Sequence, residues 1–159
     1  MKNKGVIFAI VIPAVIVIIA PIIIAAVLFF TYIKTVPLNI GDSYTCIDGM
    51  VMTITDVQVI QRDNYDGVYT FTAFKVRYEN KGSGKAGTLA DFSIEDETGK
   101  TNNFGESSFS RWGFDEKGIP TGEYSPGSVV EGWQLFKGDA RNITLSYGHM
   151  IDLCTWKIK

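Results

Sequence analysis

The sequence predicts an all-β protein, an antiparallel β-sandwich preceded by one N-terminal transmembrane helix. Three observations lead to this prediction. The first is a long uncharged apolar run near the N-terminus. The second is the alternation of apolar and polar residues over most of the chain after residue 34, and the third is the regular spacing of turn signals between the alternating segments. The 159 residues leave room for one domain of ordinary size after the apolar run.

The apolar run covers residues 5–33, GVIFAIVIPAVIVIIAPIIIAAVLFFTYI, and contains no charged side chain. It exceeds the roughly 20 residues that a helix needs to cross the bilayer core. A cleaved signal peptide has a shorter apolar core, which a polar region follows. Here the apolar residues 27–30 come directly after Ala25 and Ala26. We therefore expect a signal anchor that stays in the chain and contacts the lipid bilayer through Val6 to Ile33.

The charges beside this anchor predict its orientation. Lys2, Lys4 and the initiator amine precede it, and only Lys34 follows it closely. Cytoplasmic flanks of membrane helices carry the excess of positive charge. We therefore expect a single-pass protein of the cell membrane, with residues 1–4 in the cytoplasm, residues 34–42 as a linker and residues 43–159 as an extracytoplasmic domain.

A pilin-like filament subunit is an alternative interpretation of the N-terminus. The sequence KNKG before a long apolar helix and a β-rich head resembles type IV pilins and archaeal filament subunits, and processing after Gly5 would expose Val6. Many such subunits carry glutamate at the fifth mature position, which is Ile10 here. Pro13 and Pro21 also disfavour tight helix packing.

The part after the anchor is predicted to consist of short strands. In residues 50–60 the apolar face changes at Asp56, which predicts a β-bulge. A hairpin turn at Asp66-Gly67 precedes residues 68–80, which have one apolar and one charged face. No segment after Lys34 requires a helix longer than one turn. Further strands are predicted at residues 43–47, 89–100, 129–137, 140–147 and 153–159.

Four segments resemble a known family. They are KVRYENKG (75–82), FSIEDETGK (92–100), YSPGSVVEGWQLF (124–136) and NITLSY (142–147). They resemble the prokaryotic family called domain of unknown function 4352, which is similar to a mycobacterial secreted immunogenic protein with an immunoglobulin-like sandwich. The resemblance implies an immunoglobulin-like fold, an exported domain and no catalytic residue. The tail after residue 147 extends past the family's usual end and is expected to supply an additional strand.

Two residues within these segments have an expected structural role. Asn80 is expected to bond its side chain to the backbone where a strand ends. Gly132 is expected to allow the close approach of a neighbouring strand or ring.

The two cysteines, Cys46 and Cys154, lie in the first and last predicted strands of the domain. The predicted orientation places both outside the reducing cytoplasm. A bond between them would close a long loop, for which the loop-entropy estimate is about 4 to 5 kcal/mol. We therefore predict a Cys46–Cys154 disulfide, and two separately buried thiols are the alternative. No Cys-x-x-Cys motif supports a redox enzyme.

The composition argues against several classes of function. The net charge is −2, the pI is near 5.4 and both signs are scattered, so no basic stripe favours nucleic acid as a partner. His149 is the only histidine, so a hydrolase built on a histidine would have to use it. We interpret it as a loop residue, and we expect no enzyme activity, no cofactor and no metal site.

One long loop, residues 104–124, is the candidate partner-binding loop because it gathers Phe109, Arg111, Trp112 and Phe114. Aromatic residues and arginine are common anchors of protein interfaces, and the end loops of a sandwich are its usual binding surface. The alternative is that Trp112 and Phe114 close the end of the core.

Asn142-Ile143-Thr144 is a glycosylation sequon, so Asn142 is a candidate modification site. Taken together, the sequence predicts a membrane-anchored, extracytoplasmic and non-catalytic domain. Its expected partner is an unidentified protein or glycan of the cell envelope.

Overall fold

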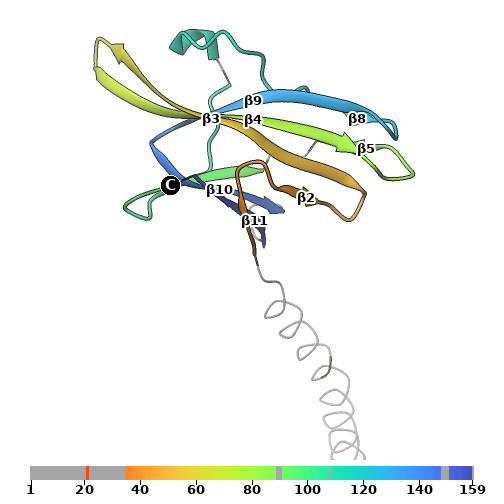
Figure 1. Cartoon of the computed structure of the whole chain (residues 1–159). Coiled ribbons are helices and arrows are strands. Elements are labelled where there is room, and N and C mark those ends of the chain that lie inside the picture. Colours follow the sequence, from red (N-terminus) through yellow and green to blue (C-terminus); the bar gives the residue numbers. More distant parts are fainter. Residues whose placement is uncertain (1–20, 22–34, 89–90, 108, 148–150, 159) are drawn as a thin grey trace, which may run out of the picture. The chain divides into compact units, whose positions relative to one another are not determined.

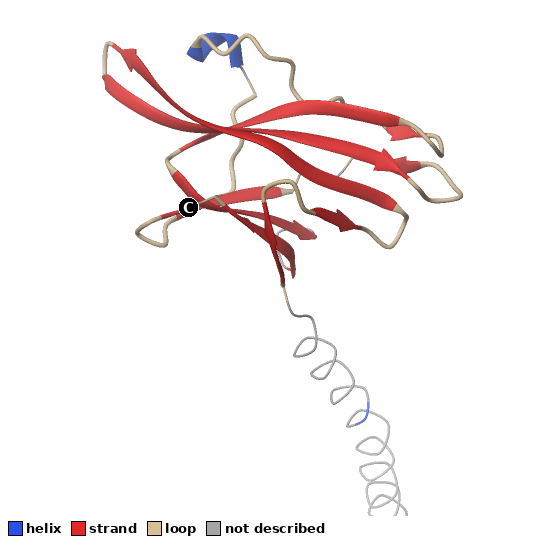
Figure 2. Ribbon diagram, in the orientation of Figure 1, coloured by secondary structure: helices blue, strands red, loops and turns tan. Residues whose placement is uncertain are grey.

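Two β-sheets pack face to face in the computed structural model, which describes residues 21, 35–88, 91–107, 109–147 and 151–158 (Figure 1, Figure 2). The strand order is β1-β11-β10-β6-β7 in one sheet and β2-β3-β4-β9 in the other, and β5 pairs with β8. The all-β fold with antiparallel sheets is therefore confirmed, with a parallel β1–β11 pair as the exception. The elements are β1 (Val36–Asn39), β2 (Ser43–Thr45), β3 (Met50–Asn64), β4 (Gly67–Asn80), β5 (Ala86–Gly87), β6 (Phe92–Asp96), β7 (Thr101–Asn102), the 3-10 helix η1 (Phe109–Trp112), β8 (Glu123–Tyr124), β9 (Val129–Lys137), β10 (Ala140–Tyr147) and β11 (Ile151–Lys157).

The longest strands, β3 and β4, have the alternation that the sequence predicts. The register of β3 against β4 shifts between Ile54 and Asp56, so the predicted β-bulge is present. On β4 the side chains of Phe74, Val76 and Tyr78 are fully buried. The positions between them carry charged side chains, which point to the opposite face of the sheet.

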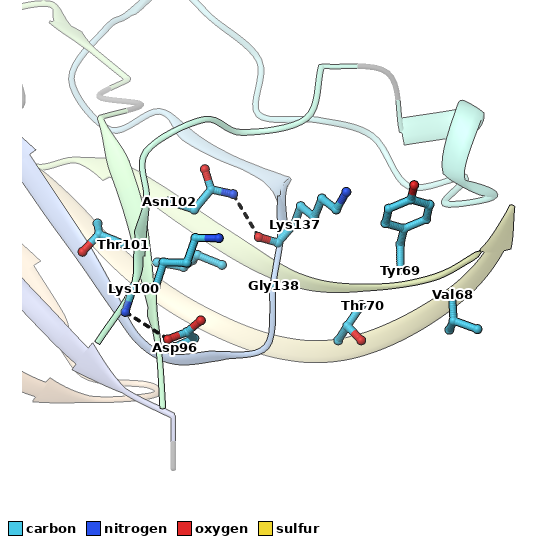
Figure 3. Close-up of a pocket in the computed structure, with 10 residues that line it drawn as sticks. Val68, Tyr69, Thr70, Asp96, Lys100, Thr101, Asn102, Lys137 and Gly138 are labelled. Carbon is cyan, nitrogen blue, oxygen red and sulfur yellow. Dashed lines mark hydrogen bonds between the residues drawn. The ribbon is translucent and has the colours of Figure 1, made fainter. Parts of the chain in front are cut away.

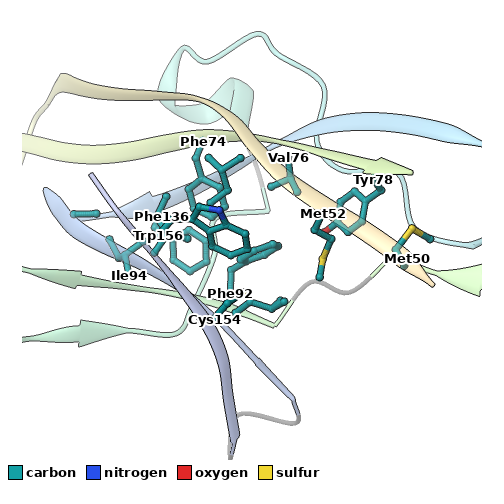
Figure 4. Packing of buried hydrophobic residues seen from close by; sticks show 14 of the residues in the cluster. Met50, Met52, Phe74, Val76, Tyr78, Phe92, Ile94, Phe136, Cys154 and Trp156 are labelled. Atoms are coloured by element: carbon teal, nitrogen blue, oxygen red, sulfur yellow. The ribbon is translucent and has the colours of Figure 1, made fainter. Parts of the chain in front are cut away.

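The main core lies between the two sheets (Figure 4). Phe74 of β4 meets Phe92 of β6 edge-to-face, with ring centroids 5.3 Å apart, so this contact joins the sheets directly. Trp156 of β11 is fully buried, and its indole N–H donates to the carbonyl oxygen of Asp42 at 3.1 Å. Burial of one such aromatic side chain contributes about 2 to 3 kcal/mol. The last strand therefore fixes the segment that precedes β2.

The segment predicted as a linker, residues 34–42, contains a strand. β1 pairs in parallel with β11 and places Val36 opposite Cys154. Pro37 is tolerated there because β1 is the edge strand of its sheet. The sandwich therefore starts at β1 rather than at residue 43, and residues 35–159 form one compact unit.

Asn80, the last residue of β4, bonds to three backbone groups as expected. Its Oδ1 accepts the N–H of Gly82 at 2.9 Å, and its Nδ2 donates to the carbonyl oxygens of Gly84 at 2.9 Å and Tyr124 at 2.8 Å. The side chain is almost fully buried. Asn80 therefore holds the β4–β5 loop and the two-stranded β5–β8 ribbon together.

The predicted membrane anchor, residues 5–33, lies outside the described residues except for Pro21. No helix in the described part of the chain is long and apolar enough to cross a bilayer.

Candidate binding surface

The β3–β4 hairpin extends past the rest of the four-stranded sheet. β9 pairs with β4 only as far as the Phe71–Lys137 pair, whereas β3 and β4 stay paired to the end, where Asn64 is opposite Gly67. Residues 60–70 therefore form a two-stranded projection at one end of the sheet (Figure 1). We call these residues the hairpin ribbon.

The segment between β7 and β8 covers the outer edge of β9. The N–H of Glu106 donates to the carbonyl oxygen of Leu135 at 2.6 Å. A Cβ atom at Gly132 would collide with the backbone of Ile119, so the close approach expected at this glycine is present. The cover removes an edge that would otherwise offer its unpaired backbone groups to other chains.

A second hydrophobic cluster lies on the outer face of the four-stranded sheet, and residues of the predicted binding loop complete it. Trp112 packs on Phe71 with ring centroids 4.8 Å apart, and Phe114 packs edge-on against Trp133 at 5.4 Å. Phe114 is buried and Trp112 is half-buried. These two side chains therefore close a second core, which is the alternative interpretation of the loop.

The other two residues of the predicted binding loop are more accessible. Arg111 is exposed, and its guanidinium carbon lies 5.3 Å from the centroid of the Trp112 ring. Phe109 is half-buried and meets Phe114 edge-on at 5.7 Å. Among the four residues of the predicted binding loop, Arg111 and part of Phe109 are therefore the most accessible to a partner.

Sequence reasoning missed three exposed apolar side chains, two on the hairpin ribbon and one beside Gly105, which bridges to Phe136 near the end of β9 where the ribbon begins. Tyr65 at its tip is 98% exposed, Val68 is 65% exposed, and Phe104, which follows β7, is 83% exposed. Single exposed apolar residues are common, but large apolar and aromatic side chains at one end of a domain are typical of interaction sites. We call Tyr65, Val68 and Phe104 the exposed end residues. For Tyr65 and Val68 the signal was the length of the β3–β4 hairpin relative to β9.

Cys46 and Cys154 are both free thiols, so the predicted disulfide is not formed in this structure. Cys154 is fully buried in β11, and Cys46, just after β2, packs against the same core. Burial, with a smaller contribution from the charge of Asp48, raises the pKa of the Cys46 thiol from 9.0 to about 12. Burial, with a smaller contribution from the charge of an ionised Cys46, raises the pKa of the Cys154 thiol to about 12 as well. Both thiols border the same core, and the reactive thiolate form is disfavoured. Their pairing on oxidation stays a prediction.

Asn142, the candidate glycosylation site, lies on β10 between β6 and β11. It is half-buried, and its Nδ2 donates to Glu95 Oε2 at 3.3 Å. The sequon therefore occupies a paired strand instead of a loop, and modification of Asn142 stays a prediction.

His149, on which the hydrolase hypothesis depends, lies outside the described residues. Within the residues that the structure describes, no three His, Cys, Asp or Glu side chains gather as ligands for a metal ion.

Two solved structures have a similar fold. The secreted protein MPT63 from Mycobacterium tuberculosis matches with a TM-score of 0.61 and 12% identity, over 79% of this chain and 98% of its own. The yjhA protein from Bacillus subtilis matches with a TM-score of 0.56 and 14% identity, over 77% of this chain and 99% of its own. No protein-family model and no curated protein sequence matches this chain. At these identities the likeness concerns the fold alone: the chain has a β-sandwich like that of MPT63, and its place in the family called domain of unknown function 4352 stays a prediction.

Proposed function

We propose that this protein is a membrane-anchored, extracytoplasmic and non-catalytic module that binds a protein or glycan of the cell envelope. The uncharged run of residues 5–33, with Lys2 and Lys4 before it, supports the anchor and its orientation. The likeness of the sandwich to a secreted mycobacterial protein supports a place outside the cytoplasm. A fold by itself does not define a function, so the binding role has to be argued from the surface.

The observation that carries the binding role is the exposure of Tyr65, Val68 and Phe104. The hairpin ribbon beneath two of them is held by Arg62, whose Nε donates to the carbonyl oxygen of Trp112 at 2.9 Å. A surface that is already ordered loses less conformational entropy when a partner binds. Tyr65 and Val68 therefore stand on an ordered surface, which favours their use as partner contacts.

Site-specific photo-crosslinking in living cells tests this function. The full-length chain carries benzoylphenylalanine in place of Phe104 in one variant and in place of Ile47 in a matched control. Ile47 is fully exposed, but it lies before β3, at the other end of that strand from the hairpin ribbon. Both variants are expressed at equal levels and irradiated.

We expect a discrete adduct in the envelope fraction with the probe at position 104 and none with the probe at position 47. Equal adducts from both positions, or none from either, would contradict a binding role for this end of the domain.

A further inference from the structure

A groove with a volume of about 490 Å³ lies beside the hairpin ribbon, where β4 runs past the end of β9 (Figure 3). Its size is within the range of about 300 to 1,000 Å³ that is usual for ligand sites. Three parts of the chain line it: residues 68–70 of β4, the β6–β7 hairpin with residues 100–102, and the β9–β10 turn with Lys137 and Gly138. None of these residues belongs to the predicted binding loop.

The edge of β4 is open along this groove. The carbonyl oxygen of Thr70 accepts the N–H of Gly138 at 2.8 Å, so the backbone of Thr70 faces the β9 side. In an antiparallel strand, every second residue points its N–H and C=O to the same side. Val68 therefore turns its backbone groups toward the β9 side as well, where no strand pairs with it among the described residues.

The edge of β7 is open in the same way. The N–H of Asp96 donates to the carbonyl oxygen of Lys100 at 3.1 Å, so the backbone of Lys100 faces β6. Thr101, the next residue, turns its N–H and C=O away from β6. β7 is the last strand of its sheet, so these groups have no partner strand in the described part of the chain. Open edges of this kind are where extended peptides add as a further strand.

Two lysines, Lys100 and Lys137, give the groove a positive charge (Figure 3). The Nζ atom of Lys137 lies 3.8 Å from the centroid of the Tyr69 ring, which holds the ammonium group at the groove. The ion pairs between described residues involve neither of the two lysines.

Among the described residues that line the groove, the one carboxylate is that of Asp96, and it accepts hydrogen bonds from its own turn. Its Oδ1 accepts the Thr98 hydroxyl at 2.6 Å, the Thr98 N–H at 2.9 Å and the Lys100 N–H at 3.0 Å. These hydrogen bonds, with that of the Thr98 hydroxyl the strongest, lower the pKa of the carboxyl group. The charge of Lys100 also lowers this pKa, by a smaller amount. Asp96 therefore stabilises the turn and offsets part of the Lys100 charge, and the two ammonium groups together still exceed this one carboxylate in charge.

We propose that this groove binds an extended acidic peptide segment of the envelope partner. The peptide backbone pairs with the open edges at Val68 and Thr101, and its carboxylates meet Lys100 and Lys137. This inference rests on the binding function proposed above and specifies the chemistry of the partner.

A peptide fits the groove better than a glycan does. Protein sites for sugars commonly use a free aromatic face, and Tyr69 is the aromatic residue among the described residues that line this groove. The ammonium group of Lys137 already lies over the Tyr69 ring, and Trp112 meets this ring edge-on with the centroids 5.8 Å apart. The groove offers backbone edges and charge instead, which match an extended peptide.

Fluorescence anisotropy with the full chain in a non-ionic detergent tests this proposal. The probe is a labelled, acetylated and amidated hexapeptide of alternating glutamate and valine. The matched control peptide has glutamine in place of glutamate, and a short oligogalacturonate of similar charge represents an anionic glycan.

We expect the glutamate peptide to bind and the glutamine peptide to bind much more weakly. The Lys100→Gln, Lys137→Gln double variant should weaken binding about tenfold, since each exposed charge pair is worth a few-fold in affinity. Lys157→Gln, an exposed position on β11 away from the groove, should leave it unchanged. Val68→Pro removes one donor that faces the groove and should also weaken binding, with thermal unfolding recorded as the check on folding.

Equal binding of the two peptides, tighter binding of the oligogalacturonate, or full affinity in the double lysine variant would overturn the groove proposal. If the Phe104 crosslink persists in that case, the binding function stands and only the groove is wrong. If neither the peptide nor the crosslink is seen, both proposals are overturned.

Discussion

The Nε atom of Arg62 donates a hydrogen bond to the carbonyl oxygen of Trp112 across 2.9 Å. This bond joins the hairpin ribbon to the segment that covers β9. The Trp112 ring in turn lies on Phe71 and against Tyr69, with centroid distances of 4.8 Å and 5.8 Å. The ribbon and the covering segment therefore support each other, and the end of the domain that carries the proposed binding surface is a packed structure.

Trp112→Ala should destabilise the domain by about 2 to 3 kcal/mol, because it removes a large half-buried ring from the second hydrophobic cluster. Arg111→Ala is the control next to it, since its side chain is exposed, and should stay within about 0.5 kcal/mol of the wild type. Urea unfolding followed by fluorescence measures both. Unchanged stability in Trp112→Ala would contradict the packing of this ring in a second core.

Asn80→Ala should cost about 2 to 3 kcal/mol. The substitution removes the buried Asn80 side chain and leaves the N–H of Gly82 and the carbonyl oxygens of Gly84 and Tyr124 without their bonds to it in a partly buried place. The exposed Asn103→Ala provides the matched control, for which we expect almost no change. Chemical unfolding of both variants gives the comparison, and equal stabilities would rule out a structural role for the Asn80 side chain.

Gly132→Ala should lower the melting temperature strongly. The new Cβ atom would collide with backbone atoms of Ile119, which cannot move aside as the end of a flexible side chain can. We expect a loss of about 2 kcal/mol or more. Gly84→Ala adds the same methyl group in open space and should have little effect. Differential scanning calorimetry distinguishes them, and similar melting temperatures would show that the segment over β9 is not closely packed.

The domain should lose stability in alkaline solution. Burial raises the pKa of Cys46 and Cys154 from 9.0 to about 12, while an unfolded chain keeps the lower value. The unfolded state therefore releases protons first, and the contribution of both thiols is fully present below about pH 9 and is lost as the pH rises toward 12. Burial also raises the pKa of Tyr44 and Tyr78, which act in the same direction.

Urea unfolding at a series of pH values tests this dependence. The Cys46→Ala, Cys154→Ala double variant should show a shallower decline above pH 9 than the wild type, because the two buried thiols no longer contribute to it. Parallel declines would indicate that the thiols are not buried as described.

The alternation within single strands could be predicted from the sequence, and most pairings between distant strands could not. The bulge at Asp56 and the buried face of Phe74 and Val76 follow from a period of two, which each strand carries in its own residues. The strand β1 was predicted as a linker because its partner, β11, comes more than 100 residues later and Pro37 suggests a loop. A parallel pair at such a separation leaves no local signal.

The second hydrophobic cluster had a signal in the sequence. Phe71 and Ala73 lie on the same face of β4 as the charged Lys75 and Arg77. The two apolar side chains indicate that another part of the chain covers this face in the first half of β4. The groove had no such signal. It exists because the β3–β4 hairpin is longer than β9, and its residues come from three separate parts of the chain.

The position of residues 35–159 outside the cytoplasm is the claim on which the binding role depends. Treatment of intact cells with proteinase K, followed by immunoblotting of the full-length chain, tests it most directly. We predict that the domain is digested while a cytoplasmic marker protein survives. A domain that survives in intact cells and is digested only after lysis would contradict the extracytoplasmic location, and with it the proposed function.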